Sequence, residues 1–272
     1  MMRQLAELDR LDAPQRSKPA RRRRGPLVLM AIVGAVAVLL AMQPSSLLPV
    51  LGAGRGADHG TVIPHPLGTP AAAPTGSGGY QFSRTEGPGP VTYDPCRPVH
   101  LVVNGAVAPP GADQLLRQAL DEASHATGLV FVIDGRTDEE PRSHRSLARG
   151  ALLSKDWPPV LVAWTSPRVL PELSGNVAGF AGSTAVSDSS GAKRYVTGAV
   201  NLDGPAIADI LHREDGWAEA RAIVMHELGH LVGLDHVDDP RQLMFPENTG
   251  QTRFGPGDLR GLHELGLGRC AV

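Results

Sequence analysis

The hydrophobic and polar positions divide the chain into stretches with different patterns. From Leu27 to Met42 no side chain is charged or strongly polar, which predicts one apolar helix. Residues 49–79 show no apolar period and consist of about 40% Gly and Pro, above the roughly 25–30% that marks disordered segments. Strand-like and helix-like periods begin near Tyr80, so we expect one folded domain over residues 80–272.

Within this domain the periods predict an α+β fold. Asp113 to Thr127 places its apolar residues on one helical face, and the following Gly128 is typical of a helix end. A second helix is expected from Asp215, a residue type that favours the N-cap, to Val232. A third is expected from Pro256 to Leu265, with proline in its first turn. Charged residues 135–158 are predicted as a long exposed loop. Short apolar runs predict strands over residues 99–103, 129–133, 160–164, 179–186 and 195–201.

The apolar stretch near the N-terminus is predicted as a signal-anchor that crosses a membrane over residues 26–48. A helix from Leu27 to Leu48 would be about 33 Å long, enough for a hydrocarbon core of about 30 Å. Arginines precede it, including the run Arg21–Arg24, so residues 1–25 are expected as a basic cytoplasmic tail and the domain is expected outside the cell. Residues 49–79 would then be a flexible linker. A cleaved signal peptide that releases a secreted protein is one alternative, and a buried helix of a soluble core is another.

The candidate chemistry lies in residues 226–236, which read HELGHLVGLDH. His226 and His230 are four residues apart, so a helix presents both imidazoles on one face. Gly233 can adopt the left-handed conformation that ends a helix, and the chain can then return His236 to the same place. Three imidazoles are a ligand set of catalytic zinc, which keeps a further position for water. We therefore expect a zinc site with these three histidines as ligands.

Glu227 directly follows the first of these histidines, which places a carboxylate beside the open side of the metal as a general base. Residues 263–266 repeat the letters HELG, but position 267 is leucine where the second histidine would stand. We expect no metal there and interpret that copy as an ordinary helix surface. The other histidines show no spacing typical of metal ligands.

The pattern H-E-x-x-H-x-x-G-x-x-H resembles that of the metzincin metalloproteases. Leu243-Met244-Phe245-Pro246 resembles the Met-turn of their matrixin branch. The resemblance implies that Met244 forms an apolar floor beneath the zinc. It also implies that Phe245 and Pro246 line the pocket for the residue after the scissile bond. The implied fold is a zincin-like catalytic domain with a twisted five-stranded mixed sheet and three helices, preceded here by one N-terminal transmembrane helix.

The same resemblance implies that an edge strand over residues 179–186 faces the substrate cleft. Gly179 and Gly182 would let an extended peptide approach that edge and pair with it, although a glycine-rich turn is the alternative. Many matrixins also hold a second, structural zinc and calcium ions. No histidine cluster matches the second zinc in this sequence, and calcium at carboxylates such as Asp238 and Asp239 stays an open alternative.

The chain has two cysteines, Cys96 and Cys270, which bracket the predicted domain. On the expected topology both lie in an oxidising compartment, where a disulfide bond is the default. Residues 94–98, DPCRP, are weakly similar to the matrixin propeptide sequence that holds a cysteine on the zinc. A cysteine on the metal and two free thiols are therefore the alternatives to the disulfide.

These features predict a membrane-tethered, extracytoplasmic zinc endopeptidase that cleaves protein or peptide substrates, with Glu227 as the general base for a zinc-bound water. A net charge of −2 gives no electrostatic reason to expect a nucleic-acid partner, and we expect a monomer. One alternative is a catalytically weak peptide-binding or adhesion module on the same fold. Another is a metzincin of a different branch with a narrow substrate.

Overall fold

The structure is a computed structural model that describes residues 65–145, 147, 151, 156–188 and 191–271, all within one compact unit. The predicted basic tail, the predicted anchor over residues 26–48 and residues 49–64 of the predicted linker lie outside the described residues. No helix in the described part of the chain has the length and apolar character needed to cross a membrane.

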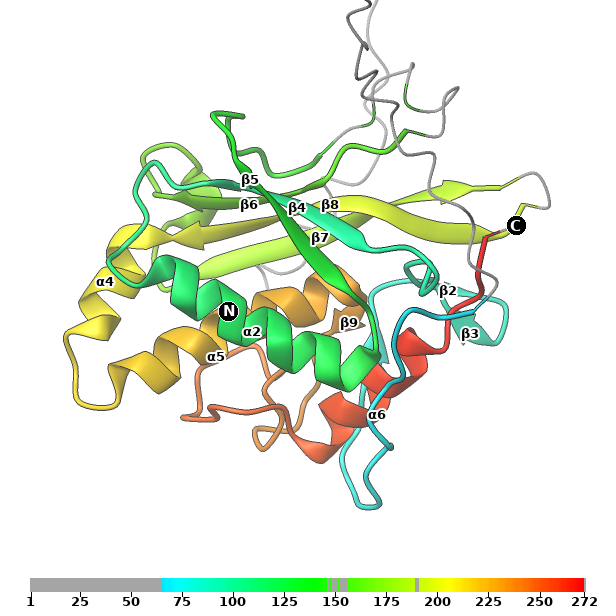
Figure 1. Cartoon of the computed structure of the whole chain (residues 1–272). Coiled ribbons are helices and arrows are strands. Elements are labelled where there is room, and N and C mark those ends of the chain that lie inside the picture. Colours follow the sequence, from blue (N-terminus) through cyan, green and yellow to red (C-terminus); the bar gives the residue numbers. More distant parts are fainter. Residues whose placement is uncertain (1–64, 146, 148–150, 152–155, 189–190, 272) are drawn as a thin grey trace, which may run out of the picture. The chain divides into compact units, whose positions relative to one another are not determined.

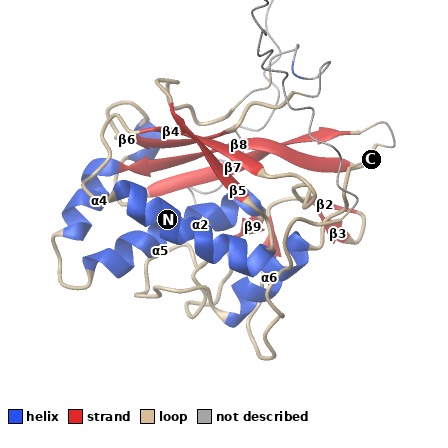
Figure 2. Ribbon diagram, in the orientation of Figure 1, coloured by secondary structure: helices blue, strands red, loops and turns tan. Residues whose placement is uncertain are grey.

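A mixed five-stranded sheet forms one layer of the unit (Figures 1 and 2). Its strands, in spatial order, are β5 (Phe131–Arg136), β4 (Val99–Asn104), β6 (Val160–Thr165), β8 (Lys193–Asp203) and β7 (Gly179–Ser187). The first four are parallel, and β7 runs antiparallel to β8 at one edge. The predicted mixed sheet and its edge strand are confirmed. The strand β5 begins two residues later than expected, because Leu129 belongs to the turn after the preceding helix, where its N–H bonds to the Thr127 hydroxyl.

The second layer consists of helices on one face of the sheet (Figure 1). They are α2 (Ala112–Thr127), α4 (Gly204–Leu211), α5 (Gly216–Val232) and α6 (Pro256–Gly266). A short 3₁₀ helix, η2 (Pro171–Leu173), lies between β6 and β7 in the chain. These are four α-helices in the described part of the chain, so the prediction of three is wrong by one, because α4 was missed. Its N-terminus has a local signal: Asp203 accepts a hydrogen bond from the Ala206 N–H, and Pro205 lies in the first turn.

The predicted start of α5 near Asp215 is confirmed, but not the capping contact that motivated it. Asp215 is the N-cap residue, with a left-handed φ of 58°, and its side chain makes no capping hydrogen bond. The helix α5 instead gains its support from tertiary packing, since it lies against β7 and β8 on one side and against α2 on the other. This packing places α5, with its histidines, beneath the edge of the sheet.

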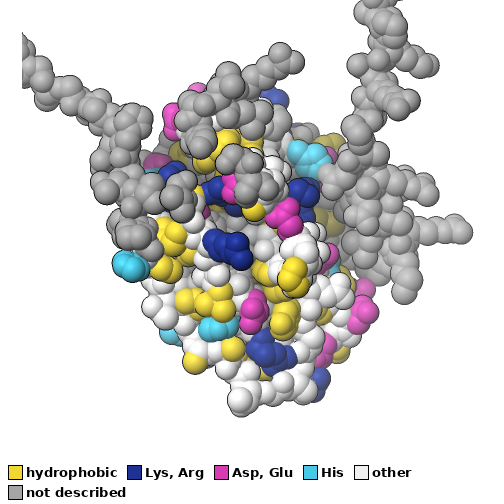
Figure 3. All heavy atoms as spheres, turned by 90° about the vertical axis from the view of Figure 1, so that its right-hand side faces the viewer, with side chains coloured by type: hydrophobic (Ala, Val, Ile, Leu, Met, Phe, Trp, Pro, Cys, Tyr) yellow, Lys and Arg dark blue, Asp and Glu magenta, His cyan; other side chains and the backbone are white. Residues whose placement is uncertain are grey.

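The core lies between the two layers. Leu101 and Trp164 of the sheet join Leu116 of α2 and Leu228 of α5 in one buried cluster. The opposite face of the sheet is partly covered by residues 139–145, which we expected as an exposed loop. Their carbonyl groups accept hydrogen bonds from side chains of β4, β7 and β8. Acidic and basic side chains are interspersed on the face shown in Figure 3, without a patch of a single sign.

The described residues of the predicted linker contact the domain. The Leu67 N–H donates to the Pro95 carbonyl, and the Ala71 N–H donates to the carbonyl of His125 at the end of α2. Arg260 of α6 donates to the Gly76 carbonyl at 2.9 Å and also to the Gly78 carbonyl. Within the described residues, contacts with the domain are therefore already present at Leu67, before Tyr80.

Three short strands follow this segment: β1 (Gln81–Phe82), β2 (Thr85–Glu86) and β3 (Gly89–Pro90). The strands β2 and β3 pair with each other, while β1 pairs with β9 (Leu234–Asp235). The chain then reaches Cys96, which forms a disulfide bond with Cys270. This bond ties the C-terminal residues to the start of β4. The alternatives of free thiols and of a cysteine on the metal are therefore wrong for this structure.

Candidate metal centre

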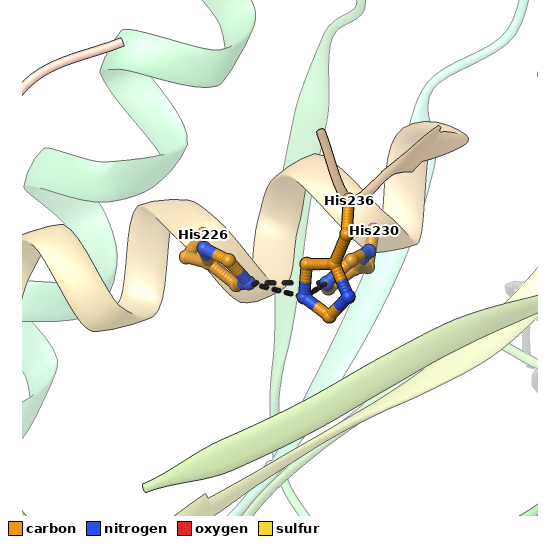
Figure 4. A group of neighbouring side chains, drawn as sticks. All are labelled: His226, His230 and His236. Atoms are coloured by element: carbon orange, nitrogen blue, oxygen red, sulfur yellow. Dashed lines mark hydrogen bonds between the residues drawn. The ribbon is translucent and has the colours of Figure 1, made fainter. Parts of the chain in front are cut away.

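The three histidines of the HELGHLVGLDH sequence converge on one point (Figure 4). His226 and His230 extend from successive turns of α5, and His236 follows β9 after the chain has turned back at Gly233. Gly233 has a φ of 124°, a conformation that L-residues rarely adopt, so glycine is required at this turn. The Nε2 atoms of the three rings lie 3.1, 3.1 and 3.2 Å from one another.

The ring tautomers follow from the partners of the other nitrogens. His226 Nδ1 lies 2.7 Å from the Leu243 carbonyl oxygen, and His230 Nδ1 lies 3.0 Å from the Leu234 carbonyl oxygen. Carbonyl oxygens only accept hydrogen bonds, so each Nδ1 carries the proton and each Nε2 presents a lone pair. Lone pairs facing each other at about 3 Å repel unless a cation lies between them.

Zinc fits this donor set. With Zn–N bonds of about 2.0–2.1 Å, tetrahedral geometry separates the ligand nitrogens by roughly 3.3–3.4 Å, close to the spacing of the Nε2 atoms. Burial lowers the pKa of His226 to about 4 and that of His230 well below its ordinary value. The pKa of His236 is also lowered by burial, although neighbouring Asp235 opposes the shift. The rings are therefore neutral at pH 7, as metal ligands must be.

Among the described residues, one other cluster brings together three potential ligands: Asp94, Cys96 and Cys270. Its two cysteines are joined in the disulfide bond, and Asp94 accepts hydrogen bonds from the Cys96 and Ala271 N–H groups. The candidate calcium ligand Asp239 is engaged by Arg241. The HELG copy lies on α6, where His263 bonds to the Ala71 carbonyl and Glu264 is exposed.

Glu227 lies on the same turn of α5 as the first histidine, with only 5% of its surface exposed. Its Oε2 atom is buried without a hydrogen-bond partner among the described residues. Burial raises the pKa of this carboxyl to about 8, and a cation at the histidine site would favour the carboxylate and oppose that shift. A buried carboxyl one residue from His226, with an unpartnered Oε2 atom, suits a general base for a metal-activated water, and that role stays a prediction.

Gly179 and Gly182, the two glycines predicted beside the substrate, have different surroundings. A Cβ atom at Gly179 would lie 2.8 Å from Cγ and 3.0 Å from Oε1 of Glu227. A Cβ atom at Gly182 would meet no heavy atom within 4 Å. The start of β7 is therefore packed against Glu227, whereas open space adjoins the strand at Gly182. A role of either glycine in peptide binding stays a prediction.

The predicted Met-turn lies against the histidine helix. Met244 is fully buried, and a Cβ atom at Gly229 would be only 2.6 Å from its Sδ atom. Glycine is intrinsically unfavourable in the middle of a helix. At position 229 it lets Met244 approach α5 between the first two histidines. Phe245 is half-buried and Pro246 is exposed; their role in a substrate pocket stays a prediction.

Sequence reasoning missed the groups that orient the histidines. Asp258, buried in the first turn of α6, accepts hydrogen bonds from the N–H groups of Leu243 at 2.6 Å and Gly255 at 2.9 Å. It thereby holds the residue whose carbonyl orients His226. The sequence offers only an acidic residue in the first turn of a helix, which does not reveal a partner fifteen residues away.

Comparison with known proteins identifies a family and several proteins that this chain resembles. Residues 179–265 match the family model described as Matrixin. Matrilysin from Felis catus is 33% identical over 75 residues, which cover 23% of this chain and 29% of that protein. The chain thus spans less than a third of the length of this curated relative.

Solved structures found in the comparison include the archaemetzincin of Methanopyrus kandleri, with 15% identity, a TM-score of 0.37, and coverage of 61% of this chain and 93% of that one. A zinc-dependent peptidase from Methanocorpusculum labreanum has 14% identity and a TM-score of 0.31, over 60% of this chain and 98% of that one. Scores this low add no argument about function. The Matrixin match, however, includes the histidine helix described above, and together with the matrilysin relative it supports a matrixin-like zinc-peptidase domain in this chain.

Proposed function

We propose that this chain is a zinc-dependent endopeptidase that hydrolyses peptide bonds of protein or peptide substrates. The observation that carries the proposal is the convergence of three neutral imidazole Nε2 atoms, 3.1–3.2 Å apart, beside the buried carboxyl of Glu227. The Matrixin match over residues 179–265 includes all four of these residues and supports the same activity. A protein that only binds peptides has no need for a buried, unpartnered carboxyl at this place.

The residues have separate roles in this reaction. His226, His230 and His236 would hold zinc through Nε2. When bound, zinc supplies a Lewis acid that polarises water and the scissile carbonyl. The Glu227 carboxylate would accept a proton from the attacking water and pass it to the nitrogen of the leaving amine. The exposed edge of β7 would pair with an extended substrate backbone, since no further strand of the sheet lies beyond it in the described residues.

The replacement Glu227→Gln tests the role of the carboxylate, because it keeps the shape of the side chain and removes the base. We expect near-stoichiometric zinc and a peptide hydrolysis rate lower by roughly 10²–10⁴-fold, the usual contribution of a positioned general base. Glu264→Gln is the matched control, since it changes the same residue type in the HELG copy on α6 and should leave the rate unchanged. Glu227→Gln protein that cleaves quenched peptides at the wild-type rate would refute this mechanism. Wild-type protein that binds zinc and cleaves no peptide would favour the binding module.

We also infer that the domain acts outside the cell, attached to the membrane by residues 26–48. The arginines before this apolar segment support that orientation. The disulfide bond between Cys96 and Cys270 fits it too, because such bonds persist in oxidising compartments.

A further inference from the structure

The residues before the five-stranded sheet contact the loop of the candidate metal centre. The strand β1 pairs antiparallel with β9, with Gln81 opposite Asp235 and Phe82 opposite Leu234. The two residues of β9 are the stretch of chain between the turn at Gly233 and the third histidine. The N-terminal segment therefore forms the partner strand of the loop that presents His236.

Ser83 contacts the backbone between His230 and His236. Its N–H donates to the Gly233 carbonyl at 2.9 Å, and its hydroxyl donates to the Leu234 carbonyl at 2.7 Å. The Leu234 carbonyl is the same group that accepts the Nδ1–H of His230. A carbonyl oxygen has two lone pairs and can accept both hydrogen bonds. The Leu234 oxygen, 151 residues from Ser83 along the chain, thus connects Ser83 to the predicted metal ligand His230.

Other groups also hold this loop within the described residues: Leu234 is buried in the core, and the Gly233 N–H donates to the Gly229 and His230 carbonyls of α5. Gly233 has a left-handed backbone, β9 is two residues long, and a pair of strands this short is marginal unless other groups hold it. On its far side the Val237 N–H donates to the Met244 carbonyl. On the side of α5, the pairing with β1 and the contacts of Ser83 add hydrogen bonds to the Gly233 and Leu234 carbonyls. If this pairing is loosened, the Leu234 carbonyl and the residues that lead to His236 are held less firmly in place.

We propose that Ser83 is a positioning residue for the metal centre. Its hydroxyl and the β1–β9 pairing fix the Leu234 carbonyl, which sets the tautomer and orientation of His230, and they hold the loop that carries His236. Groups that hydrogen-bond a metal ligand directly commonly change metal affinity by 10–100-fold when they are lost. Ser83 acts one hydrogen bond further out, through the Leu234 carbonyl. The inference rests on the histidines being zinc ligands, as in the proposed function.

The test measures zinc affinity and not turnover. Full-length Ser83→Ala protein is compared with wild type by competition for Zn²⁺ with a chromophoric chelator. We expect an affinity about tenfold lower, at the low end of that range, because Ser83 is exposed and water can partly replace its hydroxyl. Ser83→Thr keeps the hydroxyl and should restore most of the affinity. The visible spectrum of the Co²⁺-loaded protein should change in Ser83→Ala, since it reports the geometry of the ligands.

Ser124→Ala is the matched control. The Ser124 hydroxyl also donates to a backbone carbonyl at 2.7 Å, that of Leu129, at the end of α2 and away from the histidines. Ser124→Ala should lower the melting temperature about as much as Ser83→Ala does, but it should keep the zinc affinity of wild type. Equal zinc affinity in Ser83→Ala and wild type would overturn the inference, as would equal losses in Ser83→Ala and Ser124→Ala. If wild-type protein binds zinc no more tightly than His230→Ala protein, the histidines are not a zinc site. That result would overturn the proposed function.

Discussion

Replacing Gly179 with alanine should displace the general base without touching a metal ligand. The new Cβ atom would lie 2.8 Å from Cγ and 3.0 Å from Oε1 of Glu227, and 3.1 Å from the Asn201 carbonyl oxygen. That oxygen belongs to the backbone of β8 and cannot yield easily, so the Glu227 side chain must move. An ordinary contact between carbon atoms is about 3.5–4.0 Å, so the required displacement is roughly 0.7–1.2 Å.

A displacement of this size has a predictable consequence. Misplacing a catalytic group by about 1 Å can lower a rate by about 10²-fold, which corresponds to roughly 2.7 kcal/mol in the activation barrier. The overpacking itself should cost about 1–3 kcal/mol of folding stability. We therefore expect kcat for peptide hydrolysis to fall by about 10²-fold while bound zinc and KM change little. If Gly179 acted mainly by letting a peptide approach the strand, KM would rise instead.

Steady-state hydrolysis of a quenched fluorescent peptide separates these outcomes, with the zinc content of each preparation measured alongside. Gly182→Ala is the control on the same strand, because a Cβ atom there would meet no heavy atom within 4 Å. A kcat for Gly179→Ala within about threefold of wild type, a loss far below the 10²-fold expected, would refute the reasoning. An equal loss of kcat in Gly182→Ala would refute the reasoning as well, because a Cβ atom at position 182 does not approach Glu227.

Two further predictions concern pH and topology. Burial holds the pKa of His226 at about 4, below the ordinary value of 6.5, so the folded protein should retain zinc at pH 6 and release it only as the pH falls toward 4. The histidines of the unfolded chain gain protons already near pH 6.5. The stability that the neutral histidines of the folded protein contribute is therefore present above pH 6.5, and it is lost as the pH falls from 6.5 toward 4. Equilibrium dialysis with a zinc-release midpoint at or above pH 6.5 would contradict the first expectation. For the topology, protease added to intact cells should remove residues 80–272 and leave an N-terminal tag protected; mature protein in the medium that begins near residue 50 would instead indicate a cleaved signal peptide.

Local spacing determined the parts of this protein that depend on one element at a time. The four-residue interval between His226 and His230 predicts two imidazoles on one face of a helix, and Gly233 predicts the turn after it. The apolar periods predict α2, α5, α6 and the five strands of the sheet to within a few residues. The missed helix α4 had a signal in Asp203 and Pro205, which lay at the end of a strand and were not interpreted as a helix start.

Tertiary structure alone decided which distant groups surround those residues. No local period relates Ser83 to the Leu234 carbonyl, Asp258 to the Met-turn, or Gly179 to Glu227. These contacts arise where β1, α6 and β7 pack against α5 and the loop that follows it, and packing depends on the shapes of all the surfaces at once. A sequence pattern identifies residue types suited to a metal site, because coordination chemistry and helix geometry are local. The orientation of each ring depends on carbonyl groups that other segments hold in place, and that dependence appears only when the chain is folded.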